Sequence, residues 1–249
     1  MKILLPPSET KLPGGDGSTY NGAELSFPEL AEHRERLAEQ LIAVCLKPKT
    51  AMRVLDLGGR LAREIDRNAS LRITPTMPAI ERYVGVLYDA LSVRTLTTAQ
   101  RRRADERLMV GSALFGVLAA TDAIPAYRLS AGSKIPKIGA LRNYWKPVLQ
   151  PLLEELAAEE LLVDLRSGAY QSLAPARGAV TARVLSEKPS GARRVVSHAN
   201  KHTKGVLARA LATTSARCTS VSDIERVATR AGLRIEVLGD THFDVIVPG

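Results

Sequence analysis

The segment Leu161-Leu162-Val163-Asp164-Leu165 has the composition of a buried β-strand, and Arg166-Ser167-Gly168-Ala169-Tyr170 follows it directly. The first segment is apolar apart from one acid, whereas the second presents a guanidinium group and two hydroxyl groups. In open α/β sheets, ligand sites gather at the ends of strands. These two segments therefore predict an α/β protein with a polar site at the end of this strand.

The same pattern occurs near both ends of the chain. Residues 2–5 predict a first strand, and Pro6-Pro7-Ser8-Glu9-Thr10-Lys11 follows it. Near the other end, the strand-like pair Val195-Val196 runs into Ser197-His198-Ala199-Asn200-Lys201-His202-Thr203-Lys204-Gly205, a dense group of donors and cations. We expect both ends to meet in one polar, anion-attracting site, because exclusion of water strengthens every charge contact made there.

Hydrophobic periodicity and turn residues predict the remaining elements. The expected helices are 28–46, 50–57, 60–68, 98–110, 141–160 and 201–212, and the expected strands are 112–118, 180–185 paired with 194–196, 233–238 and 243–247. Ser222-Asp223-Ile224-Glu225 has the pattern of a capping box that opens a helix ending at Ala231, with Gly232 just beyond its end.

Length and charge limit the classes of protein to consider. The chain has 249 residues, of which 45% are hydrophobic and 24% charged, so we expect one domain with a sizeable core. Residues 177–217 hold nine Lys or Arg and one Glu, a net charge of +8 out of +9 for the whole chain. A concentrated basic face attracts phosphates, although a solvated face of a basic protein has the same composition.

Several classes are disfavoured by the sequence. The apolar run after Met1-Lys2 is too short for a signal peptide and no run is long enough to span a membrane, so we expect a cytoplasmic protein. Cys45 and Cys218 form no CxxC pair, and free thiols are expected. The glycine-rich loop at 13–18 lacks the spacing of a phosphate-binding P-loop.

The polar residues leave the chemistry open. His198 and His202 are four residues apart, but there is no evident third ligand and Lys201 and Lys204 would repel a metal ion, so neither a metal nor a cofactor is expected. His198 fits hydrogen bonding, proton transfer or a satisfied position at a strand end. Glu9 and Lys11 fit an acid–base pair in a pocket and, equally, a buried structural ion pair.

The segment 47–68 resembles a helix-hairpin-helix, in which a glycine turn between two short helices presents backbone amides to a DNA phosphate. Gly58-Gly59 separates the two expected helices, and Lys47-Pro48-Lys49 precedes them. The candidate DNA-binding residues are Lys47, Lys49, Gly58, Gly59 and Arg60. A Gly-Gly break between two packed helices has the same sequence, so both interpretations stand.

Several separated motifs, in this order, resemble the YaaA family of bacterial peroxide stress proteins over nearly the whole chain. They are Leu5-Pro6-Pro7-Ser8-Glu9, Tyr88-Asp89-Ala90-Leu91, Ile124-Pro125-Ala126-Tyr127-Arg128-Leu129-Ser130, Tyr144-Trp145, Asp164-Leu165-Arg166-Ser167-Gly168-Ala169-Tyr170, Val196-Ser197-His198, Asn200-Lys201 and Thr203-Lys204-Gly205. Ala199, His202 and Thr10 depart from the family pattern, which indicates a specialised, actinobacterial-type paralogue.

The resemblance implies a mixed α/β fold with a central mixed sheet, flanking helices, a helix-hairpin-helix and a basic cleft that binds duplex DNA. It also implies the family's cellular role, which is to limit damage from peroxide and free iron. The cleft would be lined by Ser8, Glu9, Lys11, Tyr127, Arg128, Arg166, Ser167, Tyr170, Ser197, His198, Asn200, Lys201 and Lys204.

Two functions therefore remain from the sequence. The first is non-specific binding of double-stranded DNA in peroxide stress. The second is an enzyme of secondary or nucleotide metabolism that acts on a small anionic or nucleobase-like substrate. In that enzyme, Lys201 and Arg128 would hold the anion, and Glu9 or His198 would move a proton.

Overall fold

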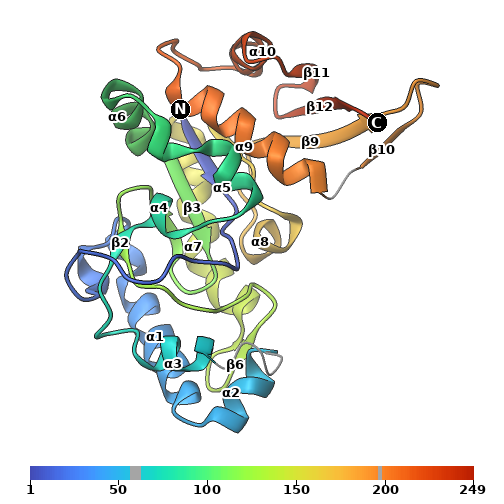
Figure 1. Cartoon of the computed structure of the whole chain (residues 1–249). Helices are drawn as coiled ribbons and strands as arrows, with labels where there is room; N and C mark the ends of the chain where they lie inside the picture. Colours follow the sequence, from blue (N-terminus) through green and yellow to red (C-terminus); the bar gives the residue numbers. More distant parts are fainter. Residues whose placement is uncertain (57–62, 196–197) are drawn as a thin grey trace.

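A central mixed sheet forms the frame of the molecule (Figure 1). The structure, a computed structural model, describes residues 1–56, 63–195 and 198–249. The sheet has the order β11-β12-β9-β8-β1-β3-β4, and β10 pairs with β9 beside this path. Its strands are β1 Lys2–Leu5, β3 Leu108–Ser112, β4 Gly116–Ala119, β8 Leu162–Asp164, β9 Val180–Glu187, β10 Arg193–Val195, β11 Arg234–Gly239 and β12 His242–Pro248. The mixed α/β class predicted from the sequence is confirmed.

Strand β1 lies in the parallel core of the sheet. It pairs with β3 on one side and with β8 on the other, in the registers Ile3↔Leu108 and Ile3↔Val163. Strands β9 and β12 continue the parallel arrangement, whereas β4, β10 and β11 are antiparallel to their neighbours. The chain leaves β1 towards β3 and leaves β8 towards β9, so β1 and β8 form a topological switch point, where the carboxyl ends of strands leave room for a ligand.

Helices cover both faces of the sheet. In Figure 1, α9 His198–Thr213 crosses the front of the sheet and α7 Leu141–Glu159 lies behind it. This burial on two faces explains why β1 is a continuous apolar run, with Ile3, Leu4 and Leu5 fully buried. The other helices are α1 Ala31–Cys45, α2 Pro48–Val54, α3 Arg63–Ala69, α4 Ala79–Arg82, α5 Val86–Leu91, α6 Thr98–Arg107, α8 Gly168–Leu173 and α10 Val221–Arg230.

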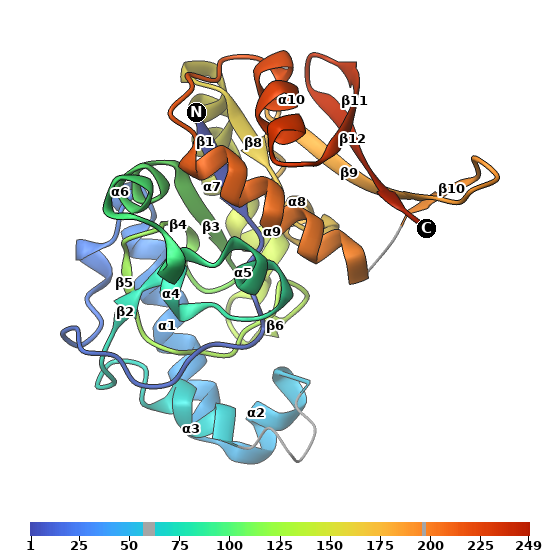
Figure 2. The same ribbon diagram turned by 45° about the horizontal axis from the view of Figure 1, so that its top comes forward.

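Short elements complete the fold. In the described residues, the connections contain the 3₁₀ turns η1 Gly22–Glu24, η2 Pro28–Leu30 and η4 Val93–Thr95. They also contain the small ladders β2 Met77–Pro78 with β5 Ala123–Ile124 and β6 Lys134–Ile135 with β7 Gly139–Ala140. Figure 2 shows that α2 and α3 form one end of the molecule, while the β9–β10 hairpin projects from the body elsewhere.

Several boundaries differ from the sequence prediction. The strand expected over 112–118 is wrong: residues 113–115 form the turn between β3 and β4. The helix expected to begin at residue 201 begins at His198. The helix expected to reach residue 110 ends at Arg107, because residues 108–112 are buried as β3 between β1 and β4. The expected capping box is wrong by two residues: Ser220 is the N-cap of α10, and its hydroxyl and the Asp223 carboxylate bond each other's backbone amides. The predicted Gly232 position is confirmed, since it follows the C-cap with a φ of 82°.

Helices α5 and α9 approach closely at Gly205. A Cβ atom at Gly205 would lie 2.3 Å from the carbonyl oxygen of Leu87 and 2.7 Å from the Cβ of Ala90. The glycine is therefore required by packing, although alanine is intrinsically the better helix former.

We predict that Gly205→Ala lowers the free energy of unfolding by about 2 kcal/mol, because α5 and α9 must separate to admit the methyl group. Chemical denaturation measures the change. Gly168→Ala, where a Cβ meets nothing within 4 Å, is the matched control and should be neutral. A Gly205→Ala protein as stable as the unsubstituted chain would show that this interface is loose.

Candidate functional site

Polar side chains gather beyond the carboxyl ends of β1, β3 and β8, at the switch point. Six of the residues predicted from the sequence are brought together there: Ser8, Glu9, Lys11, Tyr127, Arg128 and Tyr170. The Lys11 ammonium lies 4.2 Å from the centre of the Tyr127 ring, and Glu9 pairs with Arg128. Tyr170 is close enough for the Glu9 carboxylate to add to the raised pKa that burial gives this tyrosine.

Lys11 is the central cation of the site. Its side chain is 5% exposed, and its Nζ donates to the carbonyl oxygens of Ser8, at 2.9 Å, and of Glu9, at 3.4 Å. Its ammonium also lies 5.2 Å from the centre of the Tyr83 ring. Within the described parts of the chain no carboxylate forms an ion pair with it. Burial therefore dominates and lowers the pKa of Lys11 from 10.5 to about 7, despite the opposing field of Glu9.

A chain of hydroxyl groups runs beside Lys11. The hydroxyls of Tyr83 and Tyr127 are 2.8 Å apart, and that of Tyr127 is 2.7 Å from Ser112 Oγ at the end of β3. The Tyr88 ring stacks on Tyr83 at 5.6 Å, and its hydroxyl donates to the carbonyl of Pro6. Burial raises the pKa of Tyr83 to about 12, so at neutral pH these groups act as neutral hydrogen-bond donors and acceptors.

Glu9 lies at the solvent-facing rim of the site. Its carboxylate is 3.3 Å from Arg128 Nε and accepts a hydrogen bond of 3.1 Å to each oxygen from Ser130 Oγ. Arg128 is held from behind by Asn68 of α3, which accepts from the Arg128 amide and donates to its carbonyl, both at 2.8 Å. Asn68 is fully buried, so α3 fixes the backbone that carries Arg128.

Arg166 is buried, and its guanidinium group bonds partners inside the protein. It forms a buried bidentate pair with Asp164, with both contacts at 2.9 Å, and also donates to the carbonyls of Tyr170 and Ala174. Four of its five N–H groups are therefore used within the protein. Ser167 is exposed at the N-cap of α8, Gly168–Leu173.

The first turns of α9 divide between the interior and the solvent. Lys204 is buried, and its Nζ donates to the carbonyls of Leu165, at 3.1 Å, and Arg166, at 3.4 Å, so it caps the end of β8. Burial lowers the pKa of Lys204. Asn200 is partly buried, and no donor of the described residues bonds its Oδ1. Lys201 and His202 are exposed.

The predicted meeting of the chain ends is therefore indirect. Ser8 lies against Gly85, at the start of α5, and Gly205 of α9 lies against the same helix. No hydrogen bond or ion pair joins Glu9 to Lys201 in the described residues. Ser197, the side chain of His198, Gly58, Gly59 and Arg60 lie outside the part of the chain that the structure describes.

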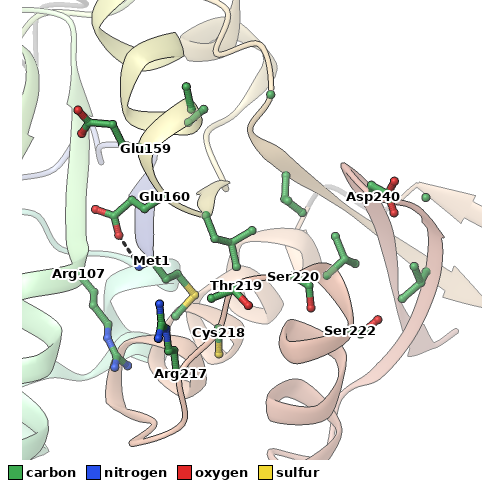
Figure 3. A pocket seen from close by; sticks show the side chains of 18 residues that line it. Met1, Arg107, Glu159, Glu160, Arg217, Cys218, Thr219, Ser220, Ser222 and Asp240 are labelled. Atoms are coloured by element: carbon green, nitrogen blue, oxygen red, sulfur yellow. Dashed lines mark hydrogen bonds and ion pairs between the residues drawn. The ribbon is translucent and has the colours of Figure 1, made fainter.

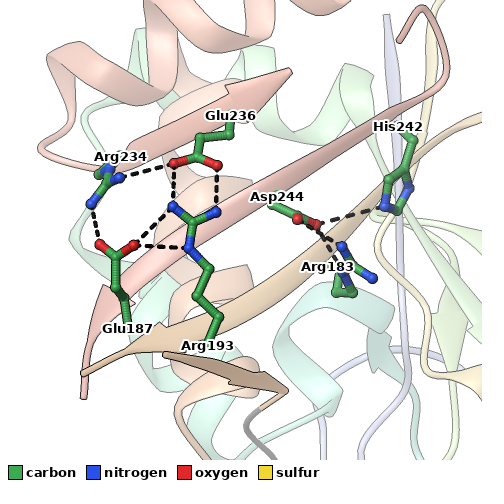
Figure 4. Close-up of polar contacts among 7 residues, drawn as sticks. All are labelled: Arg183, Glu187, Arg193, Arg234, Glu236, His242 and Asp244. Carbon is green, nitrogen blue, oxygen red and sulfur yellow. Dashed lines mark hydrogen bonds and ion pairs between the residues drawn. The ribbon is translucent and has the colours of Figure 1, made fainter. Parts of the chain in front are cut away.

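The basic segment 177–217 does not present all its charges as one face. Figure 4 shows Arg183 paired with Asp244, and Arg193 paired with Glu187 and Glu236. Arg209 donates to the carbonyls of Leu91 and Ser92, and Lys204 is buried. The sequence prediction of one basic face did not include these partners. The acids Asp244 and Glu236 come from distant strands, and the carbonyls come from other elements.

Other cations collect around α2. Lys47, Lys49 and Arg53 are exposed, and none of them forms an ion pair with a carboxylate of the described residues. Between α2 and the 128–134 loop lies a hollow of about 510 Å³, which Arg53, Arg128 and Lys134 line.

A second hollow, of about 760 Å³, lies at the opposite, amino ends of β1 and β8 (Figure 3). Arg107 and Arg217 line it together with Glu159, Glu160 and Asp240, so its charges are mixed. Glu160 already pairs with the amino group of Met1, which leaves this hollow without a clear preference for one sign of ligand.

The described residues contain no group of three or more His, Cys, Asp or Glu arranged to hold a metal ion. None of the described helices is long and apolar enough to cross a membrane. Both cysteines are buried and free, and burial raises the pKa of each thiol.

Fold and site thus define an open α/β sheet protein with a polar site at the switch point of β1 and β8. Residues 1–237 match the model of the family described as peroxide stress protein YaaA. A UPF0246 protein of Corynebacterium efficiens is 47% identical over 241 residues, covering 95% of each chain. A UPF0246 protein of Streptomyces coelicolor is 38% identical over 239 residues, covering 95% of this chain and 92% of the relative. The chain belongs to the YaaA (UPF0246) family of peroxide stress proteins.

Four residues of the site, Tyr83, Ser112, Ser130 and Asn68, were not among the site residues predicted from the sequence. Ser130 is the last residue of the motif that begins at Ile124, and Tyr83 lies five residues before the motif that begins at Tyr88, so the sequence contained a signal for both. Ser112 and Asn68 gave none, because their roles depend on contacts with Tyr127 and Arg128, respectively 15 and 60 residues away.

We predict that the lowered pKa of Lys11 makes the stability of the protein depend on pH. Between pH 7 and 10.5 the unfolded chain binds the proton that folded Lys11 releases, so the free energy of unfolding rises with pH in this window, by up to about 1.4 kcal/mol per pH unit. Below pH 7 Lys11 carries its proton in both the folded and the unfolded state. The free energy of unfolding then no longer changes with the titration of Lys11, and the stability gained at higher pH is absent.

The measurement is the unfolding free energy of the unsubstituted protein minus that of Lys11→Met, from pH 6 to 9.5, below the range in which raised tyrosine pKa values act in the opposite direction. Exposed Lys137→Met is the control. A difference that stays constant over this range contradicts the predicted pKa of Lys11.

Proposed function

We propose that this protein acts in the cytoplasmic response to peroxide stress by binding duplex DNA through its phosphates, on the surface formed by α2 and its flanking residues. Membership of the YaaA family supports the role in peroxide stress. The observation that carries DNA binding is the group of exposed cations Lys47, Lys49 and Arg53, which have no carboxylate partner in the described structure.

The two short helices α2 and α3 support the proposal of a helix-hairpin-helix. In the sequence, Gly58, Gly59 and Arg60 lie between α2, Pro48–Val54, and α3, Arg63–Ala69. In this proposal their backbone amides contact a phosphate while Lys47 and Lys49 contact its neighbours. Phosphate contacts position a duplex without reading its bases, so binding is indifferent to sequence.

A second function, catalysis or binding of a small anionic or nucleobase-like substrate, is favoured by Lys11. A protein interior rarely keeps an ammonium group buried without a carboxylate partner, and perturbed groups of this kind cluster at functional sites. The tyrosine rings beside Lys11 offer flat apolar faces, and Arg128 and Glu9 offer a cation and a proton acceptor at the rim. Lys201 and His198 remain part of this proposal as further anion-binding and proton-transfer groups.

For DNA binding, we predict that combined Lys47→Gln, Lys49→Gln and Arg53→Gln substitutions weaken binding to a random duplex and reduce the salt slope of log K by about 2 to 3 units, because each lysine or arginine releases about one counterion. Fluorescence anisotropy at several salt concentrations measures both quantities. The matched control, Lys188→Gln with Arg194→Gln and Arg217→Gln, changes the net charge equally within the 177–217 segment. A control that weakens binding as much as the α2 variant contradicts the assignment to α2.

For the second function, we predict that a thermal-shift screen of nucleobases, nucleotides and phosphorylated sugars finds a compound that raises the melting temperature, since a ligand of the native state stabilises it. Lys11→Met should reduce that shift and Lys137→Met should not. A shift of equal size in Lys11→Met would place the ligand elsewhere.

A further inference from the structure

The hollow between α2 and the 128–134 loop has the size of a small-molecule site. Its volume of about 510 Å³ falls within the range of roughly 300–1,000 Å³ that such sites occupy. Arg53 and Asp56 line it from the α2 side, and Arg128, Ser130 and Lys134 line it from the loop. Two of these residues, Arg128 and Ser130, are also the residues that hold Glu9.

The lining favours a dianion. The described lining combines Arg53, Arg128 and Lys134 and the hydroxyls of Ser130 and Ser133 with one acid, Asp56. Neither Arg53 nor Lys134 forms an ion pair with a carboxylate in the described part of the chain. Guanidinium groups match the geometry of phosphate oxygens, and an ammonium and hydroxyls add further donors, so the lining suits a phosphate group.

The Glu9 carboxylate is the anion that Arg128 and Ser130 bind in this structure, and both bind it weakly. The distance of 3.3 Å from its carboxylate to Arg128 is longer than the roughly 2.7–2.9 Å of a strong charge-assisted hydrogen bond. Ser130 Oγ is equally far, 3.1 Å, from both carboxylate oxygens, so it makes no single well-directed bond. The Glu9 side chain is 45% exposed. Glu9 is thus a weakly held internal anion that a better one can displace.

The loop side of the hollow is preorganised. Asn68 clamps the backbone of Arg128 through both its amide and its carbonyl. A ligand therefore needs to reorient only the end of the Arg128 side chain. The backbone of the loop is already ordered in the folded protein, so binding loses little further conformational entropy there.

We propose that this hollow binds a phosphorylated small molecule, and that its phosphate takes from Glu9 the donors of Arg128 and Ser130. The proposal rests on the second function above and names the class of ligand for the rim of that site. Phosphate binding frees the Glu9 carboxylate beside Lys11, which would make it available as a proton acceptor only when the ligand is bound.

Isothermal titration with adenosine 5′-monophosphate, inorganic phosphate and adenosine tests the proposal on the full chain. We expect the monophosphate to bind, adenosine not to bind, and Lys134→Gln and Arg128→Gln each to weaken the monophosphate about tenfold. Glu9→Gln should tighten binding severalfold, because it removes the competitor for Arg128 and Ser130. Lys137→Gln, an exposed lysine in the turn between β6 and β7, is the matched control and should leave binding unchanged.

The outcomes separate this proposal from the functions above. No binding of either phosphate compound, or binding that Lys134→Gln leaves unchanged, overturns it. Weaker binding of the monophosphate to Glu9→Gln also overturns it, since Glu9 would then be part of the ligand site. If only duplex DNA binds and Lys134→Gln weakens that binding, the hollow is a DNA-phosphate contact. A compound without phosphate that depends on Lys11 but not on Lys134 would support the second function and contradict the phosphate site.

Discussion

The buried position of the Lys11 ammonium at the carboxyl end of β1 is the constraint on which the site depends. Strand β1 is paired on both sides and covered on both faces, so the chain that leaves it can only continue into the space beyond the sheet. There the ammonium lies against two tyrosine rings and bonds carbonyls rather than a carboxylate. Burial of this charge lowers its pKa, and the field of Glu9 opposes that shift only in part.

The sequence predicted much of the frame and part of the site. Strands β1 and β8, the β9–β10 hairpin and the polar residues after β1 follow from local patterns of apolar, turn and polar residues. Arg166 and Lys204 show where such patterns stop being sufficient. Both were expected to bind a ligand; the structure adds that Arg166 pairs with Asp164 and that Lys204 bonds the carbonyls at the end of β8. A sequence pattern shows that a polar group is present at a strand end, and only tertiary contacts show which partner occupies it.

Charge was the property least accessible from sequence. The excess of cations in 177–217 suggested one basic face, but Asp244 and Glu236 from β12 and β11 neutralise two of those arginines. The exposed lysines near α2 were noted only as part of a candidate hairpin, and they form with Arg53 the group of cations that the DNA-binding proposal uses. Arg128 connects this surface to the interior, since it faces the hollow beside α2, pairs with Glu9 and is positioned by Asn68 of α3.

The pKa of Lys11 is the most direct test of this site. An NMR titration of the Lys11 side-chain signal measures it, and the signal is assigned by its absence from the spectrum of Lys11→Met. We expect a value of about 7, because burial outweighs the attraction of Glu9. A value near the ordinary 10.5 would mean that the ammonium group is solvated or paired with a carboxylate, and the site as described would not exist.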